Sequence, residues 1–309
     1  MNKNTQAHIG LLFTNIFFTA NLSTVKYLTR NGMIQPFGLN VIRVVVSVAL
    51  FWLFHFIYGK SDKKLQRSDI PRFVLCGLTG IAINQLLFLK GLSLTHSIHA
   101  ALLMLTTPIL ITISAAWILR EQINFYKVAG LALGIGGAFT LITAKSKSDD
   151  GSNVLLGDLL VITNAISYTV YFIIVKPLMK RYSPMEIIRW AFTFGMLFVL
   201  PFGWNEFSDI QWTAIPMKGY VFLGLIVFGG TFLAYLFNVN GIRVLGASVA
   251  GTYIYLQPVF AAIIAEIFLN EPITVTTLLA AAMIFSGVYL SNRSTIIVEE
   301  EESRQDFLG

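Results

Sequence analysis

Residues 97–121 read SIHAALLMLTTPILITISAAWILRE, and residues 247–271 read ASVAGTYIYLQPVFAAIIAEIFLNE. Both stretches are apolar, and each carries a proline that is followed thirteen residues later by a glutamate, Pro108 with Glu121 and Pro258 with Glu271. The stretches are 150 residues apart, and the same shift matches Gly91 with Gly241, Ala100 with Ala250 and Gly137 with Gly287. We interpret five matches in one register as an internal repeat.

The composition of the chain predicts that these stretches lie in a lipid bilayer. Of its 309 residues, 55% are hydrophobic and 12% are charged, whereas a soluble domain carries about 25% charged residues. The hydrophobic residues fall into runs of about 20, the helix length that crosses a hydrocarbon core of about 30 Å. We therefore predict ten membrane-spanning helices, at residues 8–28, 38–59, 71–92, 97–119, 126–144, 156–176, 185–205, 219–240, 247–269 and 274–292.

Charge and cysteine content exclude several classes of function. The formal charge is +6, but the basic residues are scattered through short connections and form no contiguous face for a nucleic acid. Cys76 is the only cysteine, which rules out disulfides and cysteine-based zinc sites. His96 and His99 stand three residues apart without a local carboxylate or cysteine, so we expect no metal site and no cofactor.

The repeat predicts how the helices are arranged in the membrane. Because each half holds five spans, an odd number, the second half must enter the membrane from the opposite side. Such an inverted repeat lets one fold open alternately to either face. We predict an all-α integral membrane protein of ten transmembrane helices. Residues 1–145 form the first five-helix repeat, residues 146–293 the second, and residues 294–309 a flexible cytoplasmic tail.

Basic residues in the connections predict the orientation. Ten spans put both termini on one side, and that side carries thirteen Lys and Arg residues against four on the other. Since connections rich in Lys and Arg stay in the cytoplasm, both termini are expected to be cytoplasmic. The N-terminal segment lacks a small-residue cleavage site, so we expect the first helix to be retained. The expected location is the plasma membrane, which in a bacterium is the inner membrane, with multiple passes.

The motifs of the two halves resemble those of a known family. The segments from Pro108 to Glu121 and from Pro258 to Glu271 are similar to the paired signature of the drug/metabolite transporter superfamily, in its EamA-like branch. GDLL at residues 157–160, with AISY at residues 165–168, is similar to the start of that family's second repeat. The resemblance implies two inverted five-helix repeats around a central cavity. It also implies export or facilitated passage of small metabolites.

Ionisable residues inside the predicted spans need an account, because a charge at the centre of a bilayer costs about 2.5–3.5 kcal/mol on insertion scales. One group lies towards the extracytoplasmic third and the other towards the cytoplasmic third. The first group is Lys26, Arg43, Lys90, Glu266 and Glu271, and the second is Glu121, Lys176 and Arg189. We predict salt bridges between the repeats that form on whichever face is closed. The alternative is that these side chains snorkel to the headgroups or form static pairs.

Uncharged polar and aromatic side chains occupy the middle of several spans, a lining that suits a small neutral or zwitterionic solute. The predicted substrate-binding residues are Asn15, Asn84, Gln85, Thr107, Tyr168, Tyr171, Tyr235, Tyr255 and Gln257. Pro108 and Pro258 each remove a backbone donor, so their helices are expected to kink beside the cavity. The alternative role for the polar groups is hydrogen bonding between helices.

Two further assignments concern local structure. Asp158 stands at the start of the sixth span, where a helix N-terminus favours a carboxylate, so we expect it to cap that helix. The glycines Gly130, Gly134 and Gly137 have the spacing of a close-packing helix face.

The sequence predicts a secondary transporter rather than an enzyme, since it has no GxSxG, no HExxH and no paired intramembrane aspartates. We expect export of amino acids or related small solutes by alternating access. The alternatives are exchange of nucleotide-linked or phosphorylated solutes, which needs cations facing the cavity, and a membrane-embedded enzyme. No carboxylate lies near the middle of a span, so a facilitator or exchanger is at least as good a hypothesis as a proton antiporter. The expected partners are a small-molecule substrate and the lipid bilayer, with the chain as a monomer or homodimer.

Overall fold

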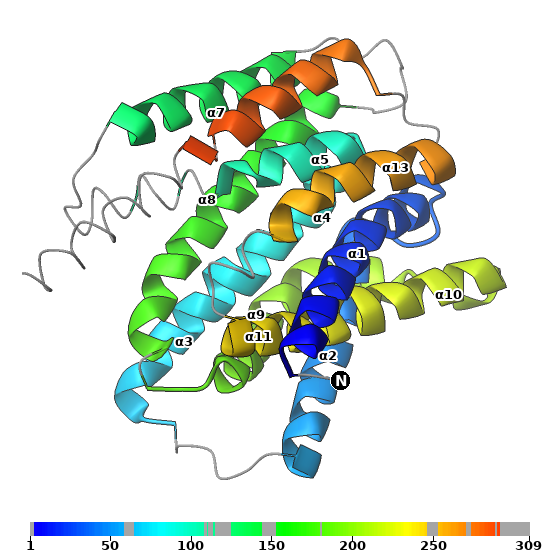
Figure 1. The fold of residues 1–309 in the computed structure, drawn as a ribbon. Helices are drawn as coiled ribbons and strands as arrows, with labels where there is room; N and C mark the ends of the chain where they lie inside the picture. Colours follow the sequence, from blue (N-terminus) through cyan, green and yellow to red (C-terminus); the bar gives the residue numbers. More distant parts are fainter. Residues whose placement is uncertain are drawn as a thin grey trace, which may run out of the picture.

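The computed structural model describes residues 3–58, 65–107, 110, 114, 125–143, 153–179, 181–245, 253–269, 273–287, 289 and 290. In this part of the chain all regular structure is helical, without strands. Figure 1 shows long helices packed directly against one another, with α7 and α8 on one side of the molecule and α10 on the other. The architecture is therefore a helical bundle whose elements tilt strongly relative to one another.

The helices follow the predicted spans in order. In the first half they are α1 (Lys3–Arg30), α2 (Pro36–Tyr58), η1 (Arg67–Asp69), α3 (Ile70–Cys76), η2 (Gly77–Ile83), α4 (Asn84–Leu94), α5 (Ser97–Met104) and α7 (Phe125–Thr143). In the second half they are α8 (Val154–Met179), α9 (Pro184–Ser208), η3 (Trp212–Ala214), α10 (Met217–Gly224), η4 (Leu225–Leu233), α11 (Ala234–Leu245), η5 (Tyr253–Leu256) and α13 (Gln257–Leu269). A further apolar helix covers Val275–Gly287.

Among the described residues, five helices are long and apolar enough to cross a membrane, by length and composition. They are Pro36–Ile57, Arg67–Leu94, Val154–Val175, Met185–Ser208 and Met217–Asn238. These coincide with the predicted second, third, sixth, seventh and eighth spans, and each end differs by four residues or fewer from the prediction. The remaining predicted spans fall on α1, α5, α7, α13 and the helix Val275–Gly287, parts of which lie outside the described residues.

Two of the long helices contain a wide, π-helical segment in their middle. The first, η2, joins α3 to α4, and the second, η4, joins α10 to α11. A shift of 150 residues carries η2 onto residues 227–233, so both segments end at equivalent residues. Within η4, Thr231 Oγ1 donates to the carbonyl of Ile226, five residues earlier, at 3.1 Å. Such segments are rare, short and frequent at functional sites, so the two point to the same functional depth of the bundle.

Glycines bring several helices into close contact. A Cβ on Gly91 of α4 would lie 2.9 Å from the carbonyl oxygen of Gly157 on α8. A Cβ on Gly287 would lie 2.6 Å from both the Gly130 oxygen and the Gly134 nitrogen on α7. The predicted close-packing face of α7 is thus confirmed, and small residues at these contacts let helix backbones approach as they do in membrane bundles.

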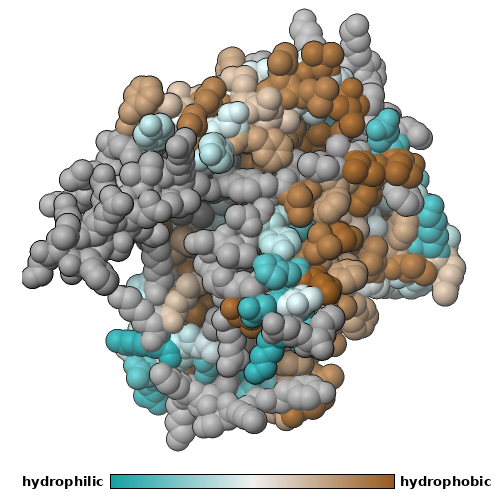
Figure 2. All heavy atoms as spheres, viewed as in Figure 1, coloured by the Kyte–Doolittle hydropathy of each residue, from teal (hydrophilic) through white to brown (hydrophobic). Residues whose placement is uncertain are grey.

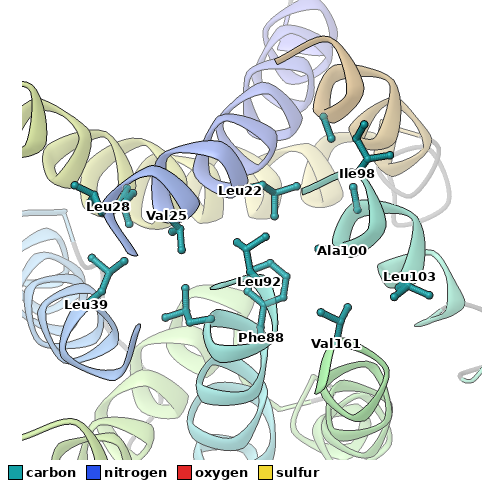
Figure 3. Packing of buried hydrophobic residues seen from close by; sticks show 14 of the residues in the cluster. Leu22, Val25, Leu28, Leu39, Phe88, Leu92, Ile98, Ala100, Leu103 and Val161 are labelled. Atoms are coloured by element: carbon teal, nitrogen blue, oxygen red, sulfur yellow. The ribbon is translucent and has the colours of Figure 1, made fainter. Parts of the chain in front are cut away.

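The interior contains apolar layers on either side of the bundle. Figure 3 shows one of them, in which Leu22 and Val25 of α1 point toward Phe88 and Leu92 of α4, with Leu39 of α2 beside them. A second layer joins α2, α3 and α9 around fully buried phenylalanines, namely Phe51, Phe73 and Phe192. These layers fix the positions of α1, α2, α4 and α9 relative to one another.

The outer surface is largely apolar. Figure 2 shows hydrophobic residues over much of the visible face, with hydrophilic residues in smaller groups. Phe56 of α2, Phe202 of α9 and Met217 of α10 expose 76%, 69% and 77% of their surface. Soluble proteins rarely leave such large patches uncovered, and a surface of this kind suits contact with lipid.

Polar contacts join the ends of the helices. Arg181 Nη1 lies 3.2 Å from the buried carboxylate of Asp69, and the Tyr182 hydroxyl donates to the same carboxylate at 3.0 Å. Burial raises the pKa of Tyr182, so its hydroxyl remains a donor at neutral pH. At the other end of α9, Glu206 accepts from the backbone nitrogens of Phe37 and Gly38 at the start of α2. A carboxylate stabilises that helix N-terminus.

Candidate functional site

Arg43 occupies the interior of the bundle. Its side chain on α2 is 6% exposed, and its Nε donates to the Thr231 hydroxyl of η4 at 2.7 Å. Arg43 stands three to four residues from the midpoint of its apolar span, or about 5 Å along the helix axis. Thr231 and Tyr168 stand equally close to the midpoints of their own spans. Arg43 therefore stands at the inner edge of the third of its span to which the sequence assigned it.

The surroundings of Arg43 differ from the predicted salt bridge. Its contact with Thr231 joins the two halves of the chain, but the partner is a hydroxyl rather than a carboxylate. Among the described residues, no carboxylate lies within ion-pair distance of the guanidinium, and its Nη groups have no hydrogen-bond partner. A cation at this depth without a countercharge is costly, which marks it as a candidate functional group.

Unpartnered polar side chains flank Arg43 on the same helix face. Asn40 and Ser47 are fully buried and stand one turn before and one turn after Arg43, the spacing that aligns side chains along a helix. Within the described part of the chain, neither amide atom of Asn40 nor the Ser47 hydroxyl has a hydrogen-bond partner. Buried polar atoms are normally hydrogen-bonded, so this stripe on α2 has hydrogen-bonding capacity that the described residues leave unused.

Two more amides reach the interior from neighbouring helices. Asn21 of α1 packs against Gly230, the residue before Thr231, and its Oδ1 has no partner in the described structure. Gln85 of α4 is 4% exposed, and both of its amide atoms are likewise unpartnered there. Because α1 and α2 each pack against both α4 and η4, the buried polar groups gather among these elements.

Three predicted tyrosines lie near one another in the interior. Tyr168 and Tyr171 of α8 have ring centroids 5.5 Å apart, and Tyr235 of α11 is close enough to interact electrostatically with both. Tyr235 also packs edge-on against Phe192, at 5.4 Å, and interacts electrostatically with Arg43. Of the three tyrosines, Tyr235 is the one that interacts electrostatically with Arg43 as well as with the pair on α8.

The orientation of Tyr168 shows that its exposed surface does not face lipid. The outward face of α8 carries the exposed residues Leu155, Leu159, Ile166 and Val170. Tyr168 stands about half a turn away from that face, in line with Gly157 and Asn164, which contact α4. It nevertheless exposes 38% of its surface. An aromatic ring exposed on the inward face is available to a solute.

Other predicted substrate-binding residues form hydrogen bonds between helices. Gln257 of α13 donates to Asn15 of α1 at 2.8 Å. Asn84 and Asn164 each donate to the other's backbone carbonyl, at 3.4 and 2.7 Å, which ties α4 to α8. For these amides the structure shows the alternative role, interhelical hydrogen bonding. Thr107 is half-buried, and the side chain of Tyr255 lies outside the described structure.

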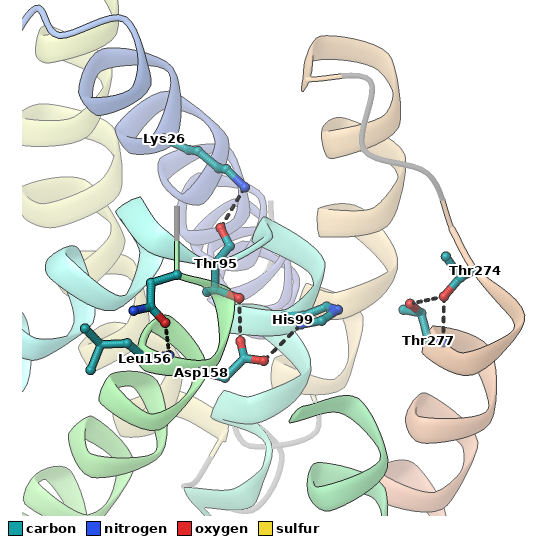
Figure 4. Close-up of polar contacts among 8 residues, drawn as sticks. Lys26, Thr95, His99, Leu156, Asp158, Thr274 and Thr277 are labelled. Atoms are coloured by element: carbon teal, nitrogen blue, oxygen red, sulfur yellow. Dashed lines mark hydrogen bonds and ion pairs between the residues drawn. The ribbon is translucent and has the colours of Figure 1, made fainter. Parts of the chain in front are cut away.

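A buried cluster joins α1, α4, α5 and α8 (Figure 4). Lys26 Nζ donates to the backbone oxygen of Thr95 at 2.7 Å, and the Thr95 hydroxyl donates to Asp158. The second oxygen of Asp158 lies 3.1 Å from His99 Nδ1. The expectation that Asp158 caps its helix is wrong. Its side chain is fully buried in this cluster, and Asn153 accepts from the first turn instead, from the nitrogen of Leu156.

The remaining predicted charges have separate environments. Arg189 is 5% exposed, and its guanidinium carbon lies 4.6 Å from the centre of the Trp52 ring on α2. Lys90 is half-buried and Glu266 is exposed. Of the other predicted positions, Glu121, Glu271 and Pro108 lie outside the described residues, as do the side chains of Lys176 and Pro258. No group of three or more His, Cys, Asp or Glu that could hold a metal occurs among the residues described.

Sequence reasoning missed Asn40, Ser47, Asn164 and the partners of Asp158. The signal for Asn40 and Ser47 was available, because they stand three and four residues from Arg43 in an otherwise apolar helix. Thr95 and His99 gave no such signal, since they are separated from Asp158 by about sixty residues. Only the packing of α4 and α5 against α8 brings them together.

Comparisons with known proteins agree on one family. The profile of the EamA-like transporter family matches residues 5–143 and again residues 155–293, two ranges related by the shift of 150. The uncharacterized transporter YetK of Bacillus subtilis is 26% identical over 249 residues, covering 80% of this chain and 75% of its own length. A probable terminal-alkyne amino-acid exporter of Streptantibioticus cattleyicolor is 28% identical over 244 residues, covering 78% of this chain and 79% of its own length.

A solved crystal structure has the same fold. It superposes with a TM-score of 0.59 at 17% identity, over 93% of this chain and 98% of the other. The family and the named relatives are transporters, not enzymes. Together with the apolar helices, they identify a multi-pass membrane protein that carries a small-molecule substrate. The chain belongs to the EamA-like transporter family.

Proposed function

We propose that this transporter exports amino acids or related small zwitterionic solutes across the cytoplasmic membrane by alternating access. The observation that carries the proposal is the polar site at mid-depth, where Arg43 of the first half meets Thr231 of the second. Substrate sites of secondary transporters lie near the midplane, at the interface between repeats. The relative from Streptantibioticus cattleyicolor, named a probable amino-acid exporter, supports this substrate class.

The repeat supports the alternating-access part of the proposal. The family profile matches two ranges of equal length, and η2 and η4 stand at equivalent positions within them. We infer ten helices in two inverted five-helix repeats, at residues 1–145 and 146–293, with residues 294–309 as a cytoplasmic tail and both termini in the cytoplasm. Rocking one repeat against the other would then expose the Arg43 region to each side in turn.

Exchange of a phosphorylated or nucleotide-linked solute is the second candidate function. Arg43 favours it, since a cation at mid-depth can bind a phosphate as well as a carboxylate. Phosphate sites in proteins commonly combine several cations or backbone donors, whereas Arg43 is the single arginine in this polar group. Amino acids therefore remain the first candidate.

The test is counterflow in proteoliposomes. Purified protein is reconstituted, vesicles are loaded with one unlabelled solute, and uptake of the same labelled solute is followed across a panel of amino acids, phosphorylated metabolites and sugars. We expect exchange of at least one amino acid and none of the phosphorylated solutes. Exchange confined to phosphorylated solutes would establish the second candidate, and repeating the assay with a pH gradient measures proton coupling.

A further inference from the structure

The stripe Asn40–Arg43–Ser47 has donors in excess of acceptors. Thr231 holds Arg43 through Nε and leaves the outer edge of the guanidinium to another partner. The Asn40 amide and the Ser47 hydroxyl are buried on the same helix face, and neither has a partner in the described chain. Three donor groups on one helix face, spread over two turns and one of them cationic, fit an anion that carries several acceptor oxygens.

We infer that this stripe binds the carboxylate of the transported solute, with Arg43 as the ion-pairing group and Asn40 and Ser47 as hydrogen-bond donors. The inference rests on the proposed function and narrows it, because it makes a carboxylate a requirement for recognition. The two Nη groups of a guanidinium match the two oxygens of a carboxylate in a bidentate pair. Thr231 orients the guanidinium, so it is a positioning residue.

The number of charges favours a carboxylate over a phosphate. One arginine neutralises the single negative charge of a carboxylate, and the neighbouring donors, Asn40 and Ser47, are neutral. A phosphate monoester carries up to two negative charges near neutral pH, which one buried cation leaves partly uncompensated. In the membrane interior an uncompensated charge is expensive.

The tyrosines explain how the rest of the solute is held. Tyr235 interacts electrostatically with Arg43, and Tyr168 offers exposed ring surface on the inward face of α8. A solute whose carboxylate binds Arg43 can therefore place its side chain against these rings. Aromatic rings pack against apolar or aromatic groups of different shapes.

The first experiment measures what the solute must carry. Starting from the amino acid that the wild-type protein exchanges best, counterflow is competed with that amino acid, with its amide and with its decarboxylated amine. We expect the amide and the amine to compete at least about tenfold less well, the loss for one charged hydrogen-bond pair. Equal competition by the amide would overturn the inference while leaving the transport function intact.

The second experiment changes the stripe. Arg43→Gln is expected to reduce exchange at least about tenfold, and Arg43→Lys, which keeps the charge without the bidentate geometry, to reduce it less. Thr231→Val, which removes the orienting hydroxyl, should weaken apparent affinity. Arg72→Gln is the matched control, because it makes the same change at an exposed arginine. Exchange by Arg43→Gln at the wild-type rate would overturn the inference.

A third measurement separates carboxylate binding from transport. Thermal unfolding in detergent is followed with acetate, benzoate, benzamide and inorganic phosphate, since a ligand that binds the folded state raises the unfolding midpoint. We expect benzoate to stabilise the wild-type protein and Arg72→Gln but not Arg43→Gln, and benzamide to stabilise none of them. This result without exchange of any amino acid would retain the carboxylate site and refute the proposed export. Stabilisation by phosphate alone, or by none of the four, would overturn the carboxylate site.

Discussion

Three cations inside the bundle are buried to a similar extent but have different partners. Lys26, Arg43 and Arg189 are 7%, 6% and 5% exposed. Lys26 donates to a backbone carbonyl, Arg189 lies over the Trp52 ring, and Arg43 donates to the Thr231 hydroxyl. Carbonyl and aromatic partners stabilise a charge without adding a countercharge. Of the three, Arg43 adjoins the unpartnered stripe on α2, which makes it the best suited to bind a solute.

The Asp158 cluster yields a prediction about stability. Asp158→Ala removes the acceptor for Thr95 and His99 at once, so we expect it to lower the free energy of unfolding by about 1–3 kcal/mol. That exceeds the average of about 0.6 kcal/mol for a neutral bond between membrane helices, because two buried donors lose their partner together. Thermal unfolding in detergent measures the change.

The matched control for this cluster is Asp209→Ala, which removes an exposed carboxylate just after α9. It should change stability by less than about 0.5 kcal/mol. If Asp158→Ala unfolds at the wild-type temperature, the cluster does not hold α5 against α8, and its hydrogen bonds contribute nothing to the fold.

At this scale the sequence predicted which polar residues are buried better than it predicted their partners. The depth of Arg43 and the tyrosines followed from the apolar runs around them. Asp158 was assigned as a helix cap because it stands near the start of a helix in the sequence. The assignment failed because its actual partners, Thr95 and His99, are distant in sequence and reach it only through the packing of the helices. Asn84 and Gln257 were assigned to a cavity because large amides need partners, and they have them in Asn164 and Asn15.

Among the helices, α4 and α8 form one of the closely approaching pairs. Gly91→Ala would put a methyl group 2.9 Å from the Gly157 carbonyl oxygen and 3.0 Å from the Val161 side chain. The helices must then move apart, and overpacking of this kind costs about 1–3 kcal/mol. We therefore expect a lower unfolding temperature for Gly91→Ala.

Gly224→Ala is the control for this contact, because no atom lies within 4 Å of the added Cβ. In a helix interior alanine is favoured over glycine by about 1 kcal/mol, so this variant should be neutral or stabilising. A loss of stability as large as that of Gly91→Ala would show that the change reports glycine flexibility rather than the approach of α4 to α8.

The sequence predicted the extents of the long helices but not their internal geometry. The predicted spans at 156–176 and 219–240 differ by two residues or fewer from Val154–Val175 and Met217–Asn238. The π-helical segments η2 and η4 were not predicted, since a continuous run of apolar residues has the same hydropathy pattern in an α-helix with or without a π-helical turn. Widening depends on what the segment packs against, which for η2 includes α9.

The orientation of the protein in the membrane can be tested by labelling cysteines introduced on either side, because the wild-type chain has a single cysteine and that cysteine is buried. Cys76 is buried and is the only cysteine, so the wild-type protein should not react with a membrane-impermeant maleimide from either side. Arg72 lies on the predicted cytoplasmic side and Asp209 on the opposite side, both exposed. We expect Asp209→Cys to be labelled in intact cells and Arg72→Cys only after the cells are opened. The reverse pattern would contradict the proposed orientation.

At the scale of the molecule, the apolar runs indicated a helical membrane protein, and the resemblance of the Pro108–Glu121 and Pro258–Glu271 segments pointed to the family that the profile match shows. They did not give the arrangement of the helices around the polar interior, because hydropathy records depth in the membrane but not which helices are neighbours. The contact between Arg43 and Thr231, which are 188 residues apart in sequence, depends on which helices are neighbours and therefore could not be predicted from hydropathy.

The wide segments η2 and η4 also have a historical meaning. A π-helical turn closes over one residue more than an α-helical turn, so a helix can accommodate an inserted residue in this way. The two segments end at residues 83 and 233, which the shift of 150 makes equivalent. Two separate insertions at one equivalent place are a less economical account than a single insertion in an ancestral half, later copied along with it. On that account the irregularity is older than the full-length chain, and it has survived on both sides of the duplication.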